Sequence, residues 1–390
     1  MLRVDAINDL RRHTAQLDSE LRDCVARVID SGWFILGREL EAFEAEFARY
    51  CGTGHCIGVA NGTDALELAL RACGVGAGGS VLTVANAGAY STTAIRAAGA
   101  EPLFIDIDDE SLLIDTAEVR RRLASPRRPS AVILTHLYGR LVPDIEIIAQ
   151  AAKDAGVPLI EDCAQAHGAR RDGKQAGTFG DFGCFSFYVT KNVTTVEGGM
   201  IACSHADDAA VLKTLALHGM SADAWDRYRD QGFVHYDVVA PGYKYNLTDL
   251  AAAFGIHQLA RVESSWLRRD ELWSYYEREL VDLPLILPPP VPANMRHARH
   301  LFTCCVDDAR TAVTRDEVLA ALHALRIGAG VHYRPVHLHA YYRRAFGHRE
   351  GDYPTAEWIG ERTFSLPLSA GVSDEDAADV VRALRRIFSR

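Results

Sequence analysis

Apolar and polar positions follow two alternating patterns along the first two hundred residues of the chain. Short apolar runs are separated by longer stretches in which apolar residues recur at helical spacing. Residues 38–50 show the helical pattern plainly, because large apolar residues share one face and glutamates occupy the others. Buried apolar strands that alternate with helices predict an α/β protein with a mostly parallel central sheet and helices on both faces.

The elements predicted in this part place the expected chemistry. Ligands of such sheets bind at the carboxyl ends of the strands, so the segments that follow the strands are the candidates. An aromatic, apolar run at 182–189 also has the character of a buried strand, and it leads to a lysine. Other strands are expected at 56–60, 81–84, 103–105, 131–135, 158–162 and 200–203, and helices at 65–73, 92–98, 116–123 and 143–154.

The chain changes character near residue 250. We expect a large domain over residues 1–250 and a smaller α/β domain over residues 251–390. The three prolines at 288–290 are the best linker candidate, because they cannot continue a helix and they stiffen the chain. The elements expected here are a loop at 225–245, a long helix from about 248 to 276, a strand at 301–306, a helix at 315–325, a loop at 331–342 and a helix from 374.

Composition and charge narrow the classes of function. With 390 residues, 48% of them apolar and 24% charged, the chain suits a soluble globular protein. A net charge of −10 and a pI near 5.8 argue against a nucleic-acid partner, which needs a basic face. The arginine runs at 120–122 and 127–128 are therefore interpreted as a solvated helix end and loop.

Cysteine usage and hydropathy bear on location. Nine cysteines without a C-x-x-C pair are typical of reduced thiols, so we expect a cytoplasmic protein. Residues 1–5 carry charges before any apolar run, which predicts no signal peptide. No apolar stretch approaches the ~20 residues that a membrane span requires, so no membrane partner is expected.

Residues 74–79 match G-x-G-x-x-G, the pattern of dinucleotide-binding loops. Their context is reversed, because they follow a predicted helix and lead into a predicted strand, whereas the functional pattern leaves a strand and opens a helix. We therefore interpret this segment as a helix C-cap and turn, and not as a nicotinamide site.

Asp162 ends a predicted parallel strand, where a carboxylate faces the ligand crevice and stays ionised only beside a cation. The protonated ring nitrogen of pyridoxal phosphate is such a cation, and its proton lets the cofactor act as an electron sink. Taken alone, Asp162 is more simply explained as a cap of the next turn.

Lys191 follows the aromatic run downstream of Asp162. Burial among aromatic residues lowers the pKa of an amine, as Schiff-base chemistry requires, although a lone lysine is more simply explained as solvated. Ser186 on the same strand, with Gly62 and Thr63 at a helix N-terminus, can supply hydroxyl and backbone donors for a phosphate. These features together indicate one ligand, pyridoxal 5′-phosphate.

Longer stretches resemble one enzyme family, in that family's order and over nearly the whole chain. The chain is similar to the DegT/DnrJ/EryC1/StrS family of sugar aminotransferases, which are pyridoxal-phosphate enzymes of the aspartate-aminotransferase fold (fold type I). The matching stretches are Asn61-Gly62-Thr63-Asp64-Ala65-Leu66, His136-Leu137-Tyr138-Gly139, EDCAQAHG at 161–168, Phe185-Ser186-Phe187, Thr190-Lys191-Asn192, Glu197-Gly198-Gly199, GYKYN at 242–246, Val331-His332-Tyr333 and His337.

The resemblance implies a role for each candidate residue. Lys191 would be the Schiff-base lysine and the proton shuttle, Asp162 would hold the pyridinium nitrogen, and Gln165 would contact the ring hydroxyl. The residues implied to bind the phosphate are Gly62, Thr63 and Ser186.

The resemblance also implies partners. A homodimer partner would reach the cofactor phosphate through Asn246, with Lys244 as the second choice, so two subunits would share each active site. The implied reaction moves an amino group from an amino acid, by family habit glutamate, to a nucleotide-linked keto-sugar in deoxyamino-sugar biosynthesis. Lys191 would serve as the base in both half-reactions.

Two features distinguish this chain within the family pattern. Where the family places an aromatic residue that stacks on the cofactor ring, this chain has Ala89, with Tyr90 one position later. Either Tyr90 stacks through a shifted loop, or a smaller group covers the ring and the substrate pocket is enlarged. Relatives that dehydrate sugars replace the lysine with histidine, so the presence of Lys191 favours transamination.

Some alternatives remain open. A sugar dehydratase or lyase is disfavoured by Lys191, and a non-catalytic sensor by the absence of a recognisable DNA-binding module. His337 and His339 alternate on the segment 332–339, but no Cys or carboxylate lies nearby in the sequence, so we expect this segment to form a polar wall for the nucleotide-sugar and no metal site. His218-Gly219 is either part of that wall or a plain surface loop.

Overall fold

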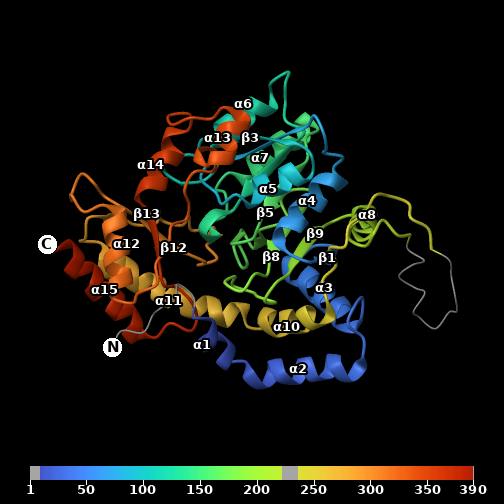
Figure 1. Cartoon of the computed structure of the whole chain (residues 1–390), viewed down its shortest axis with the longest axis horizontal. Coiled ribbons are helices and arrows are strands. Elements are labelled where there is room, and N and C mark those ends of the chain that lie inside the picture. Colours follow the sequence, from blue (N-terminus) through green and yellow to red (C-terminus); the bar gives the residue numbers. More distant parts are fainter. Residues whose placement is uncertain (1–8, 222–235, 390) are drawn as a thin grey trace.

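The computed structural model describes residues 9–221 and 236–389 (Figure 1). Its centre is a seven-stranded sheet with strand order β1-β9-β8-β5-β4-β2-β3. Neighbouring strands are parallel from β3 to β8, and only β9 of this sheet runs against the others, so the predicted mostly parallel sheet is confirmed. The strands are β1 His55–Val59, β2 Ser80–Val84, β3 Glu101–Ile105, β4 Ala131–Thr135, β5 Leu159–Asp162, β8 Phe182–Ser186 and β9 Gly199–Cys203.

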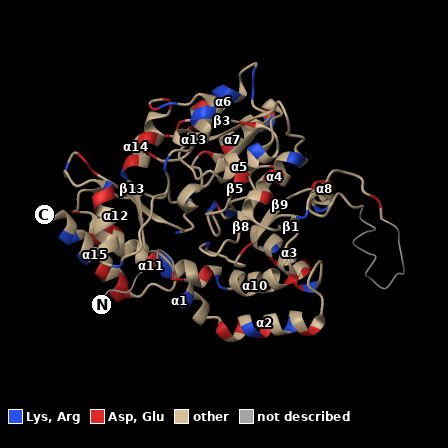
Figure 2. Ribbon diagram, in the orientation of Figure 1, with Lys and Arg blue, Asp and Glu red and all other residues tan. Residues whose placement is uncertain are grey.

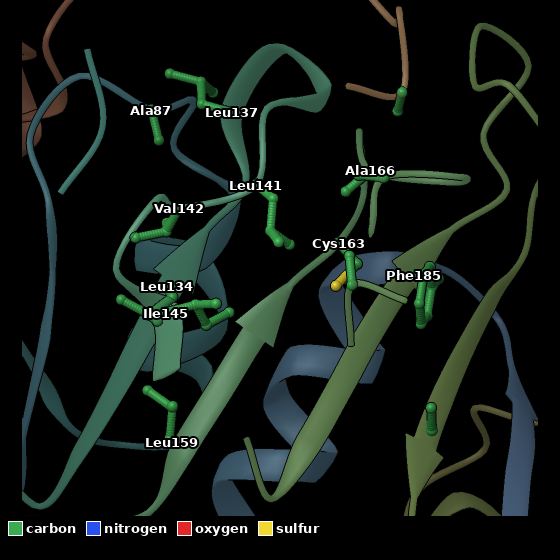
Figure 3. Close-up of a cluster of buried hydrophobic side chains, with 14 of the residues drawn as sticks. Ala87, Leu134, Leu137, Leu141, Val142, Ile145, Leu159, Cys163, Ala166 and Phe185 are labelled. Carbon is green, nitrogen blue, oxygen red and sulfur yellow. The ribbon is translucent and has the colours of Figure 1, made fainter. Parts of the chain in front are cut away.

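Helices cover both faces of this sheet, because strand side chains alternate between two apolar cores. Figure 3 shows part of the first core, where Leu134 and Leu159 from neighbouring strands meet Leu141 and Ile145 from the segment after β4. The helices on the first face are α3 Arg38–Cys51, α6 Thr116–Leu123, α7 Ile145–Ala155 and α10 Asp249–Leu259, and those on the second are α4 Gly62–Ala72, α5 Tyr90–Ala97 and α8 Ala206–Ala216.

The C-terminal part has its own core, in which three helices pack on a three-stranded antiparallel sheet. Its helices are α11 Val262–Leu280, α12 Arg315–Ala324 and α15 Asp374–Phe388, and its strands are β10 Leu285–Ile286, β12 Phe302–Val306 and β13 Thr363–Leu366. The other elements are α1 Leu10–Ala15, α2 Asp18–Ser31, α13 Ala340–Phe346, α14 Pro354–Arg362, β6 Arg170–Arg171, β7 Lys174–Gln175, β11 Met295–Arg296, and the 3₁₀ turns η1 Leu137–Gly139 and η2 Val336–Leu338.

The prediction of a single helix over 248–276 is wrong, because this segment forms two helices, α10 and α11. Arg261 leaves helical geometry between them, with φ −105° and ψ 1°. Each helix serves a different neighbour: α10 packs on α2 and α3, whereas α11 packs on α15 in the C-terminal core. The proposed domain division at residue 250 stays a prediction.

Asp249, the first residue of α10, caps a helix far away in the sequence. Its carboxylate accepts the backbone N–H groups of Gly37, Glu39 and Leu40 at the start of α3, at 2.9–3.2 Å. Helix α3 has no side-chain cap of its own, so a residue more than two hundred positions away satisfies its free donors.

The linker candidate is held against the large sheet. Arg140, just after β4, donates its two terminal nitrogens to the carbonyl oxygens of Pro289 and Pro290, at 2.8 and 2.9 Å. Proline has no backbone N–H, so this segment cannot form regular secondary structure that would pair its carbonyl oxygens. The buried Arg140 guanidinium supplies the donors for two of these oxygens. These two hydrogen bonds hold the triple proline against the segment that follows β4.

Two other predictions about local structure are confirmed. Gly74, with φ 73°, follows the C-cap of α4, so the G-x-G-x-x-G segment is a helix end and turn. The arginine run at 120–122 forms the last turn of α6.

Figure 2 shows acidic and basic residues interspersed along helices such as α2. Within residues 9–221 and 236–389, no helix has the length and apolar character to cross a membrane.

Candidate active site

The predicted site residues come from different elements and gather at one edge of the central sheet. Asp162 is the last residue of β5, Ser186 is the last residue of β8, and Lys191 follows in the loop after β8. Gly62 opens α4, which packs against β8. The parallel strands have their carboxyl ends at this edge, which is where sheets of this kind bind ligands.

Asp162 is a buried carboxylate, 6% exposed, with two neutral hydrogen-bond donors. Ser91 Oγ donates to Oδ2 at 2.9 Å, and the backbone N–H of Ala164 donates to Oδ1 at 3.1 Å. Among the described residues, no Lys, Arg or His nitrogen lies within 4.0 Å of this carboxylate. A buried negative charge with only neutral donors is suited to a cationic ligand.

Lys191 lies in the loop after β8, and its amine is close enough to Asp162 for an electrostatic attraction between them. Burial lowers the pKa of Lys191 to about 8, against the opposing attraction of Asp162. The loop is fixed by its own hydrogen bonds, because Thr194 Oγ1 and Thr195 N both donate to the Phe187 carbonyl at 3.0 Å. At pH 7, about a tenth of such an amine is unprotonated and therefore nucleophilic, far more than for an ordinary lysine.

The phosphate candidates are close together, and glycine is required for this. A Cβ at Gly62 would lie 2.7 Å from the Ser186 Cβ, so a larger residue would push α4 away from β8. One expectation changes: Asn61 Oδ1 already accepts the backbone N–H groups of Thr63 and Asp64, at 3.0 and 2.9 Å. The hydroxyls of Ser186 and Thr63 are the side-chain donors that this corner offers to a phosphate.

Gln165 is held at both ends of its amide. Its Oε1 accepts the backbone N–H of Tyr138 at 2.6 Å, and its Nε2 donates to the Tyr333 hydroxyl at 2.9 Å. An amide nitrogen carries two hydrogens, so Gln165 has one further donor for a ligand oxygen. This geometry is compatible with the predicted contact to a ring hydroxyl.

The alternatives for Ala89 and Tyr90 can be compared with the structure. Ala89 is the N-cap of α5, and Tyr90 is the first residue of that helix with 56% of its surface exposed. The Tyr90 ring meets the Tyr333 ring edge-on, with centroids 6.3 Å apart, and Gly88 leaves room for both rings. The ring of Tyr90 thus packs toward Tyr333, and a small residue stands at the position that the family pattern gives to an aromatic one.

Asn246 and Lys244 lie beside the end of β1, an edge strand of the sheet. Asn246 forms an isolated bridge with Val59 at the end of β1, and the Lys244 amine donates to Asn246 Oδ1. Lys244 is exposed and Asn246 is partly exposed at this outer strand of the sheet. The position leaves both side chains near the surface, and their role across a dimer stays a prediction.

Lys191 acts electrostatically on three histidines, of which His332 belongs to the predicted polar wall, whereas His167 and His300 are not among the predicted site residues. The pKa of His167 falls to about 3 and that of His332 to about 4, in each case through burial and then the positive charge of Lys191. The pKa of His300 is also lowered, mainly by burial and next by Lys191. These rings are therefore neutral at pH 7 and add no competing charge beside the amine.

His136 and Glu161 form a second buried pair next to the site. His136 Nε2 lies 2.9 Å from Glu161 Oε2, and its Nδ1 accepts the backbone N–H of Val142, so Nε2 carries the proton and donates. Glu161 also accepts three backbone N–H groups from the loop after β7, those of Gly177, Phe179 and Gly180, at 2.6–2.8 Å.

Cys163 completes a possible metal-ligand group with His136 and Glu161. Both nitrogens of His136 are engaged in hydrogen bonds, and burial raises the pKa of the Cys163 thiol. A ligand set of one occupied imidazole, one fully hydrogen-bonded carboxylate and one protonated thiol does not suit a metal ion. The group is better explained as a support for the ends of β4 and β5.

The histidine segment after residue 331 does not form one polar wall. His332 Nδ1 bonds with Ser365 Oγ at 2.8 Å near Lys191, whereas His337 is fully buried and bonds with Glu357 Oε1 at 2.8 Å. His339 caps α13 at the surface. The expectation of a common wall for His337 and His339 is therefore wrong. His218-Gly219 adjoins a Tyr- and Arg-rich stretch that lies partly outside the described residues.

An amine of lowered pKa near a buried carboxylate, at the carboxyl edge of a sheet covered on both faces, is the arrangement expected of a pyridoxal-phosphate enzyme of fold type I. The sequence profile of the DegT/DnrJ/EryC1/StrS aminotransferase family matches residues 15–385, and the chain belongs to this family.

Similar proteins support this assignment. The chain is 40% identical over 364 residues to the spore coat polysaccharide biosynthesis protein SpsC of Bacillus subtilis, which covers 93% of both chains. The structure of DesV from S. venezuelae aligns with a TM-score of 0.89 and 33% identity over 100% of both chains. DesI, solved in the presence of its TDP-sugar product, aligns with a TM-score of 0.85 and 28% identity over 96% of this chain and 91% of its own.

The protein is therefore an aminotransferase, and its cofactor is pyridoxal phosphate. The residues at the strand ends fit this group in three respects. Among the described residues, they offer a carboxylate with no cationic nitrogen within 4.0 Å and an amine of lowered pKa. They also offer hydroxyls at the start of α4, which can approach β8 because residue 62 is glycine.

Proposed function

We propose that this protein transfers an amino group from an amino acid, with glutamate as the expected donor, to the keto group of a nucleotide-linked sugar in deoxyamino-sugar biosynthesis. The observation that carries the proposal is the Lys191 amine, with its pKa lowered to about 8, near the Asp162 carboxylate. The sugar class is supported by the names of similar proteins, since SpsC is named for polysaccharide biosynthesis and DesI was solved with a TDP-sugar product.

The proposed catalytic residues divide the work between binding and proton transfer. Pyridoxal phosphate, when bound, supplies an aldehyde that takes up the amino group and a ring that withdraws electrons. Lys191 Nζ would hold the cofactor covalently in the resting enzyme; once the donor's amino group has displaced it, the freed amine would take a proton from the donor and return one in the acceptor half-reaction. Asp162 holds the protonated ring nitrogen, and Ser91 keeps its carboxylate in place through a bond of 2.9 Å.

The remaining site residues position the cofactor. Gln165 directs its free N–H toward the ring hydroxyl, because Tyr138 and Tyr333 fix the rest of its amide. The phosphate is held at the start of α4 and the end of β8. The residues proposed for this contact are Gly62, Thr63 and Ser186, joined by Asn246 of a second subunit.

We further propose that the protein is a homodimer with shared active sites and that it acts in the cytoplasm. Three consecutive large apolar residues after α2, Trp33, Phe34 and Ile35, are 44%, 42% and 40% exposed. A contiguous exposed apolar stretch of this kind is typical of a surface that a partner covers. The cytoplasmic location is supported by cysteines that are all unpaired.

The experiment that tests the function uses the purified protein with its cofactor, L-glutamate and a panel of nucleotide keto-sugars. We expect the visible absorbance of the lysine-bound cofactor to fall with glutamate and to recover with the correct keto-sugar, whose mass changes to that of the amino-sugar. Lys191→Ala is the control and should show neither change. A protein that eliminates water from these sugars, and aminates none of them, would instead be a lyase or dehydratase.

A further inference from the structure

The residue after Lys191 joins the catalytic loop to the C-terminal part of the chain. Asn192 is buried, and its Nδ2 donates to the carbonyl oxygen of Ala298 at 2.8 Å. Its Oδ1 lies 3.0 Å from Nδ1 of His300, which is also buried. Ala298 and His300 belong to the segment that leads directly into β12 of the C-terminal sheet.

The direction of the second bond follows from the first. A carbonyl oxygen only accepts, so the Asn192 amide must turn its NH₂ group to Ala298, and Oδ1 is left to face His300. Oδ1 only accepts, so His300 Nδ1 must carry a proton and donate it. The ring is neutral, because burial, Lys191 and Arg269 all lower the pKa of His300. His300 is thus fixed in the Nδ1–H tautomer.

We propose that His300 is a positioning residue for Lys191: its Nδ1–H holds the Asn192 side chain and thereby fixes the loop that presents the Lys191 amine. The inference rests on the role of Lys191 in the proposed function. It does not depend on the acceptor, because the same amine attaches the cofactor before any sugar is bound.

The surroundings of the amine explain why this anchor affects chemistry. The titratable groups that act on Lys191, or whose pKa Lys191 lowers, are Asp162, His167, His300 and His332. The three imidazole rings are neutral at pH 7, so their enclosure keeps the amine desolvated. A loop released from His300 would let water reach the amine, and the pKa of Lys191 would rise toward its ordinary value.

Three substitutions at position 300 separate the hydrogen bond from the volume of the ring. His300→Asn places an amide N–H where Nδ1 stands, whereas His300→Gln moves the donor to the position of Nε2. His300→Leu removes the donor and keeps an apolar side chain. The matched measurement is the rate at which the cofactor-free protein attaches pyridoxal phosphate, followed by absorbance across pH.

We expect His300→Asn to keep the apparent pKa of cofactor attachment found in the wild-type protein. His300→Gln and His300→Leu should raise it by about one unit and slow attachment about tenfold at pH 7. Equal apparent pKa values in all three variants would overturn the proposal, because packing alone would then explain the burial of His300. None of these readouts uses a sugar, so failure here is distinct from failure of the proposed reaction.

A double-mutant cycle guards against variants that fold poorly. If His300 acts through Asn192, then His300→Gln should change the attachment rate about tenfold in the wild type and hardly at all in Asn192→Ala. Additive effects of the two substitutions would contradict the inference. Urea unfolding of each cofactor-free variant shows whether a general loss of stability accompanies the change.

Discussion

Glu161 and Asp162 are adjacent carboxylates on β5, and both are buried, but they differ in how far the protein fills their hydrogen-bonding capacity. Glu161 accepts three backbone N–H groups and the His136 imidazole N–H, so its oxygens are filled by the protein itself. From the part of the chain that the structure describes, Asp162 accepts only the Ser91 hydroxyl and one backbone N–H. A carboxylate whose hydrogen-bonding capacity is filled from within supports the fold, whereas one left partly unfilled is available to a cationic ligand.

The comparison predicts its largest effect for Asp162→Asn. A neutral amide cannot hold a protonated ring nitrogen, and loss of one partner from a buried ion pair costs about 3–5 kcal/mol, which corresponds to roughly 10²–10⁴-fold in rate. The rate constant of the glutamate half-reaction should fall by that factor, as single-turnover absorbance would show. The cofactor-free variant should unfold in urea near the wild-type midpoint. A fully active Asp162→Asn would remove the distinction between the two carboxylates.

Glu161→Gln should give the reverse pattern. The new NH₂ group would face backbone N–H donors of the loop at 177–180, and unmatched buried donors should lower the free energy of unfolding by about 4 kcal/mol. Urea unfolding of the cofactor-free protein measures this loss. Protein that remains folded should still attach the cofactor. If stability stays at the wild-type level while cofactor attachment is lost, the two carboxylates have exchanged the roles assigned to them.

Lys191→Met tests whether the desolvated Lys191 amine lowers the free energy of unfolding. The folded pKa of Lys191, about 8, lies below the ordinary 10.5, so the unfolded chain binds more protons between these values and wild-type stability rises with pH there. Below pH 8 the cofactor-free Lys191→Met protein should therefore be more stable, by about 3 kcal/mol. The difference should shrink above pH 8 and vanish near pH 10.5. A constant difference across pH would show that the amine is not desolvated.

The smallest effect is expected for Ser91→Ala. It removes one neutral hydrogen bond from Asp162, worth about 1 kcal/mol, so the half-reaction should slow about fivefold. Thr93→Ala is a matched control on the exposed side of the same helix, where the hydroxyl bonds only to the Ala89 carbonyl. Equal losses in both variants would indicate a general effect on α5 and not on the carboxylate.

Sequence pattern was sufficient where local spacing decides the structure. Strand and helix periodicity predicted the parallel sheet, and a strand-end Asp162 with a downstream Lys191 among aromatic residues indicated the cofactor. Helix α8 is not among the predicted helices, although its buried residues 209, 212 and 216 have helical spacing. Helix α14 is also absent from them, and Pro354 at its first position is the local signal that marks its start.

Other features could not be derived from local pattern. The break between α10 and α11 reflects two different packing partners, which a continuous helical pattern does not reveal. His300 bonds with Asn192 across 108 positions, so no spacing rule connects them. The opposite roles of Glu161 and Asp162 are likewise invisible in the sequence, because they depend on which donors the fold brings to each side of one strand.

The cap that Asp249 places on α3 has a consequence for how the chain acquires its structure during synthesis. The start of α3 lies near the beginning of the chain, and its cap is supplied 209–212 positions later. Closing so long a loop is slow, so the helix emerges from the ribosome well before its last donors are satisfied. Nascent chains that end before residue 249 thus carry an uncapped α3, and the first face of the sheet is completed only when α10 arrives.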